Sequence, residues 1–321
     1  MRPFIGTVAA AMAFAGSAAA DEIIFAHGEN PGNPRHLAAE RFAELVETCE
    51  GSDLTVNVAP SATMGDDVEM LTATIAGIVQ ITANSQGPFA QIVPEAGAIG
   101  LPFLFEDAET AWAVLDGEIG GRLDALAREN RLTILAFWDN GIRHVSHLNR
   151  PVDTPAALSG MQIRTPSDEM TIAMFEALGA SPAPLAFSEL PSALQAGAFD
   201  GQENPLTNIH SARLHQITPH ITLTGHQYQA TPVVAGLDWW TSLDEASRSC
   251  VRDAAREAGR YQRELSRDAN AELLSTMAGE GAIFSEVADR GAFIAASAPV
   301  YADYERRLGD FVPALVQAAA R

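Results

Sequence analysis

Four polar residues stand where predicted strands end or predicted helices begin, and together they could hold an anion. Arg143 follows the apolar run LTILAFW (132–138) and the turn sequence DNG, and Arg164 ends the run MQIR. Ser167 and Asn204 precede predicted helices, whose first backbone N–H groups carry partial positive charge. A guanidinium pairs with a carboxylate through two parallel hydrogen bonds. Taken alone, each arginine is better explained by a surface ion pair, but the combination at strand ends suggests a carboxylate site.

The stretch FDGQENPLTNIH allows two interpretations of Asn204. Asp200-Gly201 is a typical turn pair, and proline, here Pro205, is favoured at the first position of a helix. Asn204 would then cap that helix through its side-chain oxygen. In the other interpretation its amide helps to hold a bound anion, and one atom can cap while another binds. The local sequence leaves both open.

The sequence lacks the short motifs that mark common catalytic and cofactor sites. It has no G-x-S-x-G elbow, no P-loop, no G-x-G-x-x-G dinucleotide motif and no H-E-x-x-H zinc motif. His144 and His147 have no other ligand candidates close by in sequence, so they are interpreted as polar residues near a turn. No metal or cofactor is therefore predicted, and nothing in the sequence indicates a reaction.

Alternating strand-like and helix-like segments surround these residues and predict an α/β fold with a mostly parallel sheet covered on both faces. Short apolar runs bounded by turn residues predict the strands, and apolar residues spaced three or four apart predict the helices. The predicted strands or extended segments are 22–28, 53–60, 78–85, 98–105, 132–138, 161–166, 182–187, 220–226 and 231–240. The predicted shorter helices are 34–51, 66–77, 108–115, 121–130, 168–179 with Ser167 as its cap, 188–197, and one after Pro205.

One predicted helix is much longer than the others. From Ser242 to Ala278 apolar residues recur at helical spacing with no proline between them, which is far above the average length of a globular helix. Such a helix can lie across two domains and tie them together. The expected domains are residues 21–141 with 230–269, and residues 142–229 with 270–321.

The first twenty residues, MRPFIGTVAAAMAFAGSAAA, have the form of an export signal. Arg2 supplies the positive start, an apolar run follows, and small residues ending at Ala20 fit a cleavage site. We expect an exported mature chain that starts near Asp21. The full sequence has a formal net charge of -21, which disfavours binding to nucleic acid or anionic lipid. All 20 cations are arginine, so the choice of arginine over lysine carries no information at any single site.

Cys49 and Cys250 are the two cysteines of the sequence. Two cysteines are too few for an all-cysteine metal site or a disulfide scaffold. Both lie on apolar faces of predicted helices, and export to an oxidising compartment permits one bridge. One disulfide and two separate buried thiols fit the sequence equally.

A series of longer motifs resembles a known family. In chain order they are LAAERFAELVE, APSATMGDDVEML, LPFLF, NGIRHVSHLNRPV, LSGMQIRTP, ALGASPAPLAFSEL, ALQAGAFDGQENP and ITLTGH. They resemble the solute-binding proteins of tripartite ATP-independent periplasmic (TRAP) transporters, the DctP family. The resemblance covers essentially the whole mature chain.

The resemblance implies a periplasmic-binding-protein-like fold, with two α/β domains around a ligand cleft and a long helix across both. It implies a monomeric periplasmic protein, not an enzyme, that captures a small carboxylate by domain closure without a cofactor. The partners it implies are the small and large membrane subunits of a TRAP transporter. The alternatives are an exported enzyme acting on a carboxylate, with Glu203 and a nearby histidine, and a ligand receptor for a sensor.

The same resemblance assigns roles to five residues. Arg164 is expected to pair with the ligand carboxylate, and Asn204 and Arg143 to assist it. Phe187 is expected to pack on the ligand, and Ser167 to lie close to its polar groups. The identity of the acid stays open among C4-dicarboxylates, 2-oxo acids, sugar acids and amino-acid-like compounds.

Further candidates rest on residue type alone. Glu29 and Asp168 could meet an amine or hydroxyl groups of the ligand. Trp239 could form a wall of the cleft together with Trp138 and Trp240, but an aromatic cluster of this kind is equally explained as core.

Overall fold

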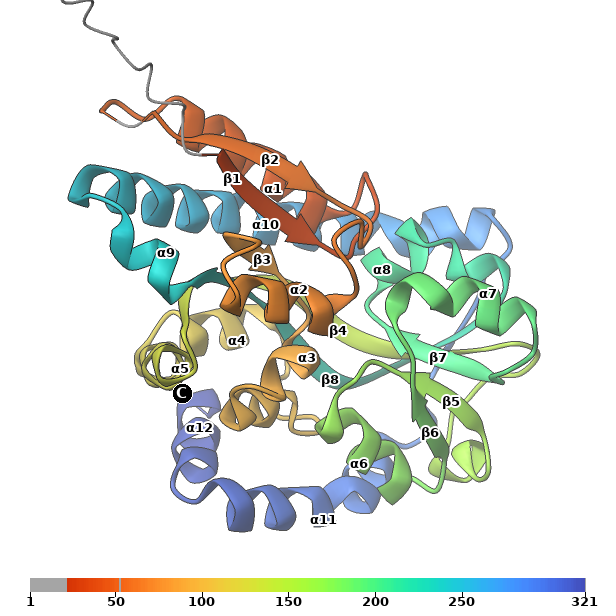
Figure 1. Cartoon of the computed structure of the whole chain (residues 1–321). Helices are drawn as coiled ribbons and strands as arrows, with labels where there is room; N and C mark the ends of the chain where they lie inside the picture. Colours follow the sequence, from red (N-terminus) through yellow and green to blue (C-terminus); the bar gives the residue numbers. More distant parts are fainter. Residues whose placement is uncertain (1–21, 52, 321) are drawn as a thin grey trace, which may run out of the picture.

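The computed structural model describes residues 22–51 and 53–320, so the export signal predicted in residues 1–20 lies outside the described part. A nine-stranded sheet forms the centre of the molecule (Figure 1). Two long strands, β4 (Leu132–His147) and β8 (His220–Gly236), pair antiparallel and run through both of its halves. From edge to edge the strands are β2 (Thr55–Ala59), β1 (Glu22–His27), β3 (Ile81–Ala83), β8, β4, β7 (Gly201–Asn204), β5 (Gln162–Thr165) and β6 (Ser181–Pro184), with β9 (Ile283–Glu286) paired to β8.

The sheet is mixed rather than mostly parallel. The flanking pairs β1–β2, β1–β3, β5–β6 and β5–β7 are parallel. In the centre, β8 runs antiparallel to β3 and β4, and β4 runs antiparallel to β7. The predicted parallel arrangement is therefore correct only for the flanks, because an apolar run indicates a strand but not its direction.

The first lobe contains β1 to β3 and the adjoining ends of β4 and β8. Asn33 caps α1 and Pro34 lies in its first turn, as expected. One face of this lobe's sheet packs against α1 through Phe42 and the buried Trp138. The helices of this lobe are α1 (Pro34–Glu47), α2 (Asp67–Ile75), α3 (Gln86–Ala90), η1 (Pro94–Gly100), α4 (Ala108–Leu115) and α5 (Glu118–Glu129).

The second lobe contains β5, β6 and β7 and the other ends of the two long strands. Its apolar core joins Ile163 of β5 to Met174 and Phe175, and to Phe293 near the C-terminus. Its shorter helices are η2 (Pro155–Leu158), α6 (Glu169–Ala177), η3 (Phe187–Glu189), α7 (Leu190–Gln195), α8 (Leu206–Ser211) and η4 (Leu214–Gln216).

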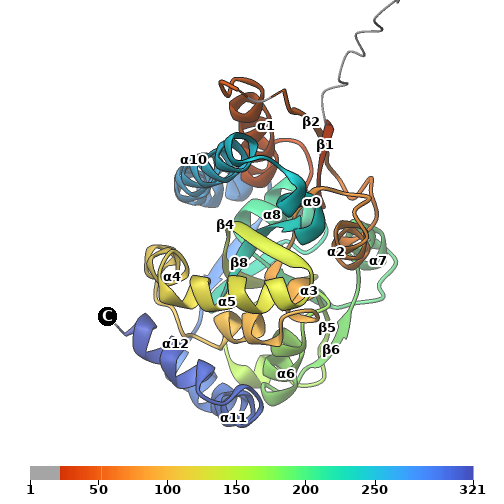
Figure 2. The same ribbon diagram turned by 60° about the vertical axis from the view of Figure 1, so that its left-hand side comes forward.

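The predicted long helix is confirmed as α10 (Glu245–Gly279), which has 35 residues and follows the short α9 (Leu237–Ser242). It packs beside α1 in the first lobe, as Figure 2 shows, and reaches α8 and β9 in the second. Two further helices connect the lobes on another side: α11 (Arg290–Leu308) packs on α6, and α12 (Phe311–Ala319) packs on α4 and α5. The domain boundaries given above remain predictions.

Three strand predictions were wrong. The segments 220–226 and 231–240 are not two strands: residues 220–236 form the single strand β8, and LDWW begins helix α9. The run 98–105 is not a strand, because η1 ends at Gly100 and turns follow. Its residues are buried beside β8, and a short apolar run cannot distinguish a strand from other buried backbone.

The predicted turn Asp139-Asn140-Gly141 is an irregularity inside β4. The pairing register with β8 shifts between Asp139 and Gly141, and Gly141 has a φ of 115°. The side chain of Gln262 on α10 donates to the Asp139 carbonyl and accepts from its N–H. Supported from α10 in this way, the chain continues as a strand through a sequence that is typical of a turn.

Three predicted helix starts also differ. Asp168, not Ser167, caps α6, and its carboxylate accepts from the N–H of Met170. Asn204 does not cap α8: it is the last residue of the buried strand β7, and Pro205 is the cap residue. α7 begins at Leu190, after a 3-10 turn, rather than at residue 188.

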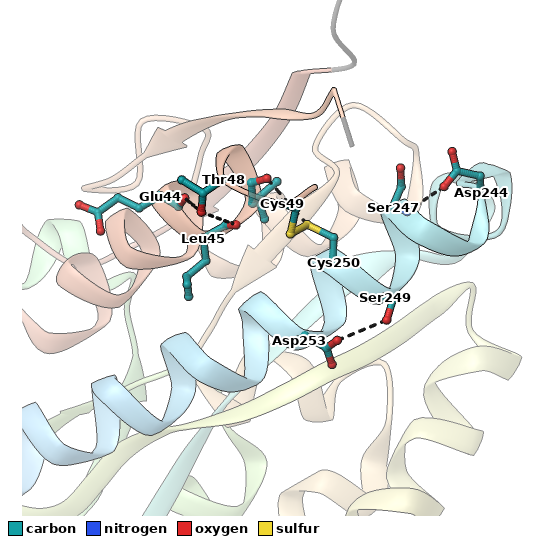
Figure 3. Close-up of a disulfide and its surroundings, with 10 residues drawn as sticks. Glu44, Leu45, Thr48, Cys49, Asp244, Ser247, Ser249, Cys250 and Asp253 are labelled. Carbon is teal, nitrogen blue, oxygen red and sulfur yellow. Dashed lines mark hydrogen bonds between the residues drawn. A yellow bond between two sulfur atoms is a disulfide. The ribbon is translucent and has the colours of Figure 1, made fainter. Parts of the chain in front are cut away.

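Cys49 and Cys250 form a disulfide, with their Cα atoms 6.1 Å apart. The alternative of two separate thiols is therefore wrong. Figure 3 shows the bridge joining the chain just after α1 to the α10 helix. It connects residues 201 positions apart within the first lobe.

Candidate functional site

A cavity lies between the two lobes, where several strands have their carboxyl ends. It leaves about 580 Å³ free of protein atoms, including its opening to solvent. The first lobe contributes Gly28, Glu29, Ala62, Asp66, Asp67, Val68, Ser85 and Pro88. The second lobe contributes Arg143, Arg164, Pro166, Ser167, Leu185, Ala186, Phe187, Ser188, Asn204 and Asn208. The position follows the general rule that open α/β sheets bind ligands outside the carboxyl ends of their strands.

The structure brings the five principal candidates together. Arg143, Arg164 and Asn204 come from β4, β5 and β7, which are neighbours in the sheet. Ser167 and Phe187 follow β5 and β6, so their loops reach the same cavity. Side chains that are separated along the chain therefore meet. The parallel strands β5 and β7 end side by side, and the antiparallel strand β4 passes the end of β7, where His144 pairs with Asn204.

Arg143 is buried and already has a carboxylate partner inside the protein. Its Nε donates to one oxygen of Glu203 at 2.5 Å, and its Nη2 donates to the other at 2.8 Å. Arg143 is 2% exposed and Glu203 is fully buried. Burial pushes the Glu203 pKa up, but the Arg143 charge and hydrogen bonds from His226 and Arg143 outweigh it, so this pKa lies below its ordinary value.

Arg164 is equally buried, at 2% exposure, but its surroundings differ. Its Nε and Nη2 donate to the carbonyl oxygen of Leu185, at 2.9 and 2.5 Å. In residues 22–51 and 53–320, no carboxylate lies within ion-pair distance of it. Desolvation lowers the Arg164 pKa to about 10. This guanidinium is therefore a buried cation that faces a cavity without a counterion.

Asn204 is the last residue of β7, the strand between β4, which carries Arg143, and β5, which carries Arg164. Its Oδ1 accepts from Nη2 of Arg143 at 3.1 Å, and its Nδ2 donates to Gln202 at 2.6 Å. These bonds fix the orientation of the amide, so that Nδ2 keeps one further N–H to donate.

The first lobe contributes an acidic wall. Glu29 is 3% exposed and accepts from Nδ2 of Asn33 at 3.2 Å and Nδ2 of Asn208 at 3.1 Å. Asp67, in the first turn of α2, accepts from the N–H of Ser85 at 3.1 Å. Desolvation, the largest effect for each, raises the pKa of both carboxyl groups above their ordinary values.

Two weaker candidates lie outside this cavity. Asp168 is buried and bonded to Thr171 and Gln229, behind the loop that carries Ser167. Trp239 is half-buried beside a separate surface hollow near Gln80. The related tryptophans Trp138 and Trp240 are core residues.

Among the cavity residues that sequence reasoning missed are Asp67 and Asn208. Asp67 follows the helix-start sequence GD at 65–66, and Asn208 lies in the first turn of α8. Both stand near the start of a helix, but that position alone does not distinguish a ligand contact from an ordinary polar surface residue.

His144 and His147, the two histidines of RHVSH, accept hydrogen bonds from backbone N–H groups. Nδ1 of His144 accepts from the N–H of Gly225, and Nδ1 of His147 accepts from the N–H of Asn149. The described residues contain no group of three or more histidine, cysteine or carboxylate side chains placed to hold a metal. Within the same residues, no helix is both long enough and apolar enough to cross a bilayer.

Comparison with known proteins establishes the family. Residues 25–307 match the model of bacterial extracellular solute-binding proteins, family 7, named DctP. The match covers most of the chain, which therefore belongs to this family, and the resemblance inferred from the sequence is confirmed. The family is one of solute-binding proteins and not of enzymes.

Individual relatives agree with this assignment. A Sinorhizobium fredii protein is 45% identical over 85% of this chain, which spans only 50% of that relative's length. The C4-dicarboxylate-binding periplasmic protein of Rhodobacter capsulatus is 32% identical, over 98% of this chain and 96% of its own. A TRAP periplasmic solute-binding protein from Roseobacter denitrificans, solved with bound β-D-glucuronate, has a TM-score of 0.89 at 30% identity, over 93% of this chain and 99% of its own. The predicted two-domain α/β fold is thereby confirmed.

Proposed function

We propose that this chain is the periplasmic solute-binding protein of a TRAP transporter, and that it captures a small organic carboxylate in the cavity between its lobes. It then delivers the acid to the small and large membrane subunits. In this proposal the chain is exported, is cleaved near Ala20, acts as a monomer and uses no cofactor. The family, the named relatives and the composition of the cavity support it.

The observation that carries the proposal is the uncompensated guanidinium of Arg164. A buried charge without a partner is costly, and a ligand carboxylate in the cavity would remove that cost. In this proposal the remaining N–H of Asn204 Nδ2 donates to the carboxylate of the same ligand, while Arg143 holds Oδ1 of Asn204. Phe187 and Leu185 would cover its apolar atoms.

Domain closure is supported by hydrogen bonds between the lobes. Asn33 of the first lobe donates to Oδ1 of Asn208 at 3.0 Å, and Asn208 donates to Glu29 at 3.1 Å. Gln91 donates to the carbonyl of Ser167 at 3.0 Å. We propose that these bonds form on closure, with β4 and β8 as the hinge.

The enzyme alternative has less support. The carboxylate of Glu203 is occupied by Arg143 and by Nε2 of His226 at 3.2 Å, and neither Glu203 nor His226 lines the cavity. A receptor for a sensor would share the whole site. Uptake of the acid into vesicles that contain the two membrane subunits, dependent on this protein, separates that alternative from transport.

A thermal-shift screen tests the proposal. The mature chain, refolded from denaturant to remove any carried-over ligand, is measured against organic acids and their amides and alcohols. An acid at a thousand times its Kd stabilises by about 4 kcal/mol, which raises the melting temperature by several degrees. A shift with acids that is absent with their amides supports the proposal. A refolded sample that responds to no acid would refute it.

A further inference from the structure

We infer that the site selects a singly charged carboxylate whose other end donates hydrogen bonds, and that it rejects dicarboxylates of the same length. The inference rests on the proposed function and specifies its ligand class. It follows from which charged residues of the two cavity walls already have a partner of opposite charge within the protein.

The second lobe offers the ligand one positive charge rather than two. Arg143 and Arg164 both line the cavity, but Glu203 engages Arg143 through both of its carboxylate oxygens. Glu203 is fully buried behind the wall, so its charge stays with Arg143. Of these two arginines, Arg164 is the one with no carboxylate partner among the described residues, which matches a single ligand carboxylate.

The first lobe opposes a second carboxylate. In the described ranges, 22–51 and 53–320, no cation lies within ion-pair distance of Asp67. Glu29 is 3.7 Å from Nη1 of Arg35, and amide donors of Asn33 and Asn208 occupy its oxygens. The Asp67 carboxylate accepts from the N–H of Ser85 at 3.1 Å, and the Ser85 hydroxyl is a second donor to it.

The two walls lie within electrostatic reach of each other. Glu29, Asp67 and Arg164 all line the same cavity. A ligand held by Arg164 therefore places its far end in the field of these acids. A hydroxyl or ammonium group there donates to a remaining lone pair of the Asp67 carboxylate, whereas a carboxylate meets like charge in a partly desolvated site.

The test compares ligands that differ only at the far end. The four-carbon series is 4-hydroxybutanoate, 4-aminobutanoate and succinate, and the six-carbon pair is galactonate and galactarate. Binding to the mature chain is measured by calorimetry at pH 7.5. We expect the donor-ended acids of at least one series to bind at least tenfold more tightly than the matched diacid, and the hydroxy and amino acids show which donor the site prefers.

Two variants connect the selectivity to one residue. Asp67→Asn keeps an acceptor for Ser85 and removes the charge, so the preference over the diacid should fall at least tenfold. Asp107→Asn makes the same change at the start of α4, outside the cavity, and should leave the ratio unchanged.

The outcomes separate the inference from the function. A diacid that binds as tightly as its donor-ended partner overturns the inference and leaves carboxylate binding intact. Unchanged selectivity in folded Asp67→Asn overturns the role of Asp67. If no acid in either series or in the wider screen binds, the carboxylate site is refuted, and the inference with it.

Discussion

Replacement of Arg164 by alanine is the sharpest test of the anion site. This guanidinium is buried, and its hydrogen-bond partner among residues 22–51 and 53–320 is the Leu185 carbonyl. We therefore expect the variant to fold and to melt near the wild-type temperature, since it loses a cation that had no carboxylate partner. Its effect should appear on binding.

The size of the effect follows from the desolvation of the bound acid. Removing one partner of a buried ion pair costs about 3–5 kcal/mol, because the other charge stays buried and unpaired. At about 1.4 kcal/mol for each factor of ten, Kd should rise by roughly 150-fold to 4,000-fold. Arg164→Lys keeps the charge but loses the planar fork, so its loss should be smaller.

The assay is calorimetric titration of an acid that the screen identifies, with wild type, both Arg164 variants and Arg256→Ala. Arg256 is an exposed arginine on α10 that lies outside the cavity and makes no ion pair with the described residues, so its variant should bind like wild type. If Arg164→Ala binds within threefold of wild type, the reasoning about this site is wrong.

Three further predictions concern stability. Glu203→Gln leaves Arg143 without its carboxylate and should lower the free energy of unfolding by about 3–5 kcal/mol, measured by urea denaturation, whereas an unchanged midpoint would contradict the buried pair. Joint replacement of Cys49 and Cys250 by alanine should cost about 2–4 kcal/mol, because their bridge closes a long loop; equal midpoints for the variant and the oxidised wild type would count against this. Burial lowers the His27 pKa from 6.5 to about 3, so the unfolded chain binds a proton at this histidine more readily than the folded chain does. Protonation of His27 therefore lowers the free energy of unfolding as pH falls from 6.5 to 3, by up to about 5 kcal/mol. In His27→Asn the decline in stability between pH 6.5 and pH 3 should be shallower, and an identical slope would show that other groups cause it.

Much of the architecture could be predicted from local pattern. The apolar spacing that predicted helices at 34–51 and 66–77, and the uninterrupted spacing of α10, are signals that act within a few residues, and each produced the expected element. The failures came where distant groups decide. Asp139-Asn140-Gly141 has the composition of a turn, yet Gln262 on α10 holds it inside a strand.

The candidate site divides in the same way. The sequence by itself placed Arg143, Arg164 and Asn204 next to predicted strand ends or a helix start. The parallel pairing of β5 and β7 then brings Arg164 and Asn204 to one edge, and the antiparallel pairing of β4 with β7 brings Arg143 beside them. It could not show that the two arginines differ. Residue type is the same in both, and only the tertiary structure gives Arg143 a buried carboxylate from β7 and leaves Arg164 with a backbone carbonyl.

The position of Asp67 in the cavity wall of the first lobe depends on the tertiary structure alone. In a chain with 41 acidic residues, nothing local distinguishes Asp67 from a solvated carboxylate. Its role depends on the approach of one lobe to the other, which removes water and sets its charge against that of the ligand. Sequence pattern reports what a residue can do, whereas the field and the solvent around it depend on groups that are distant along the chain.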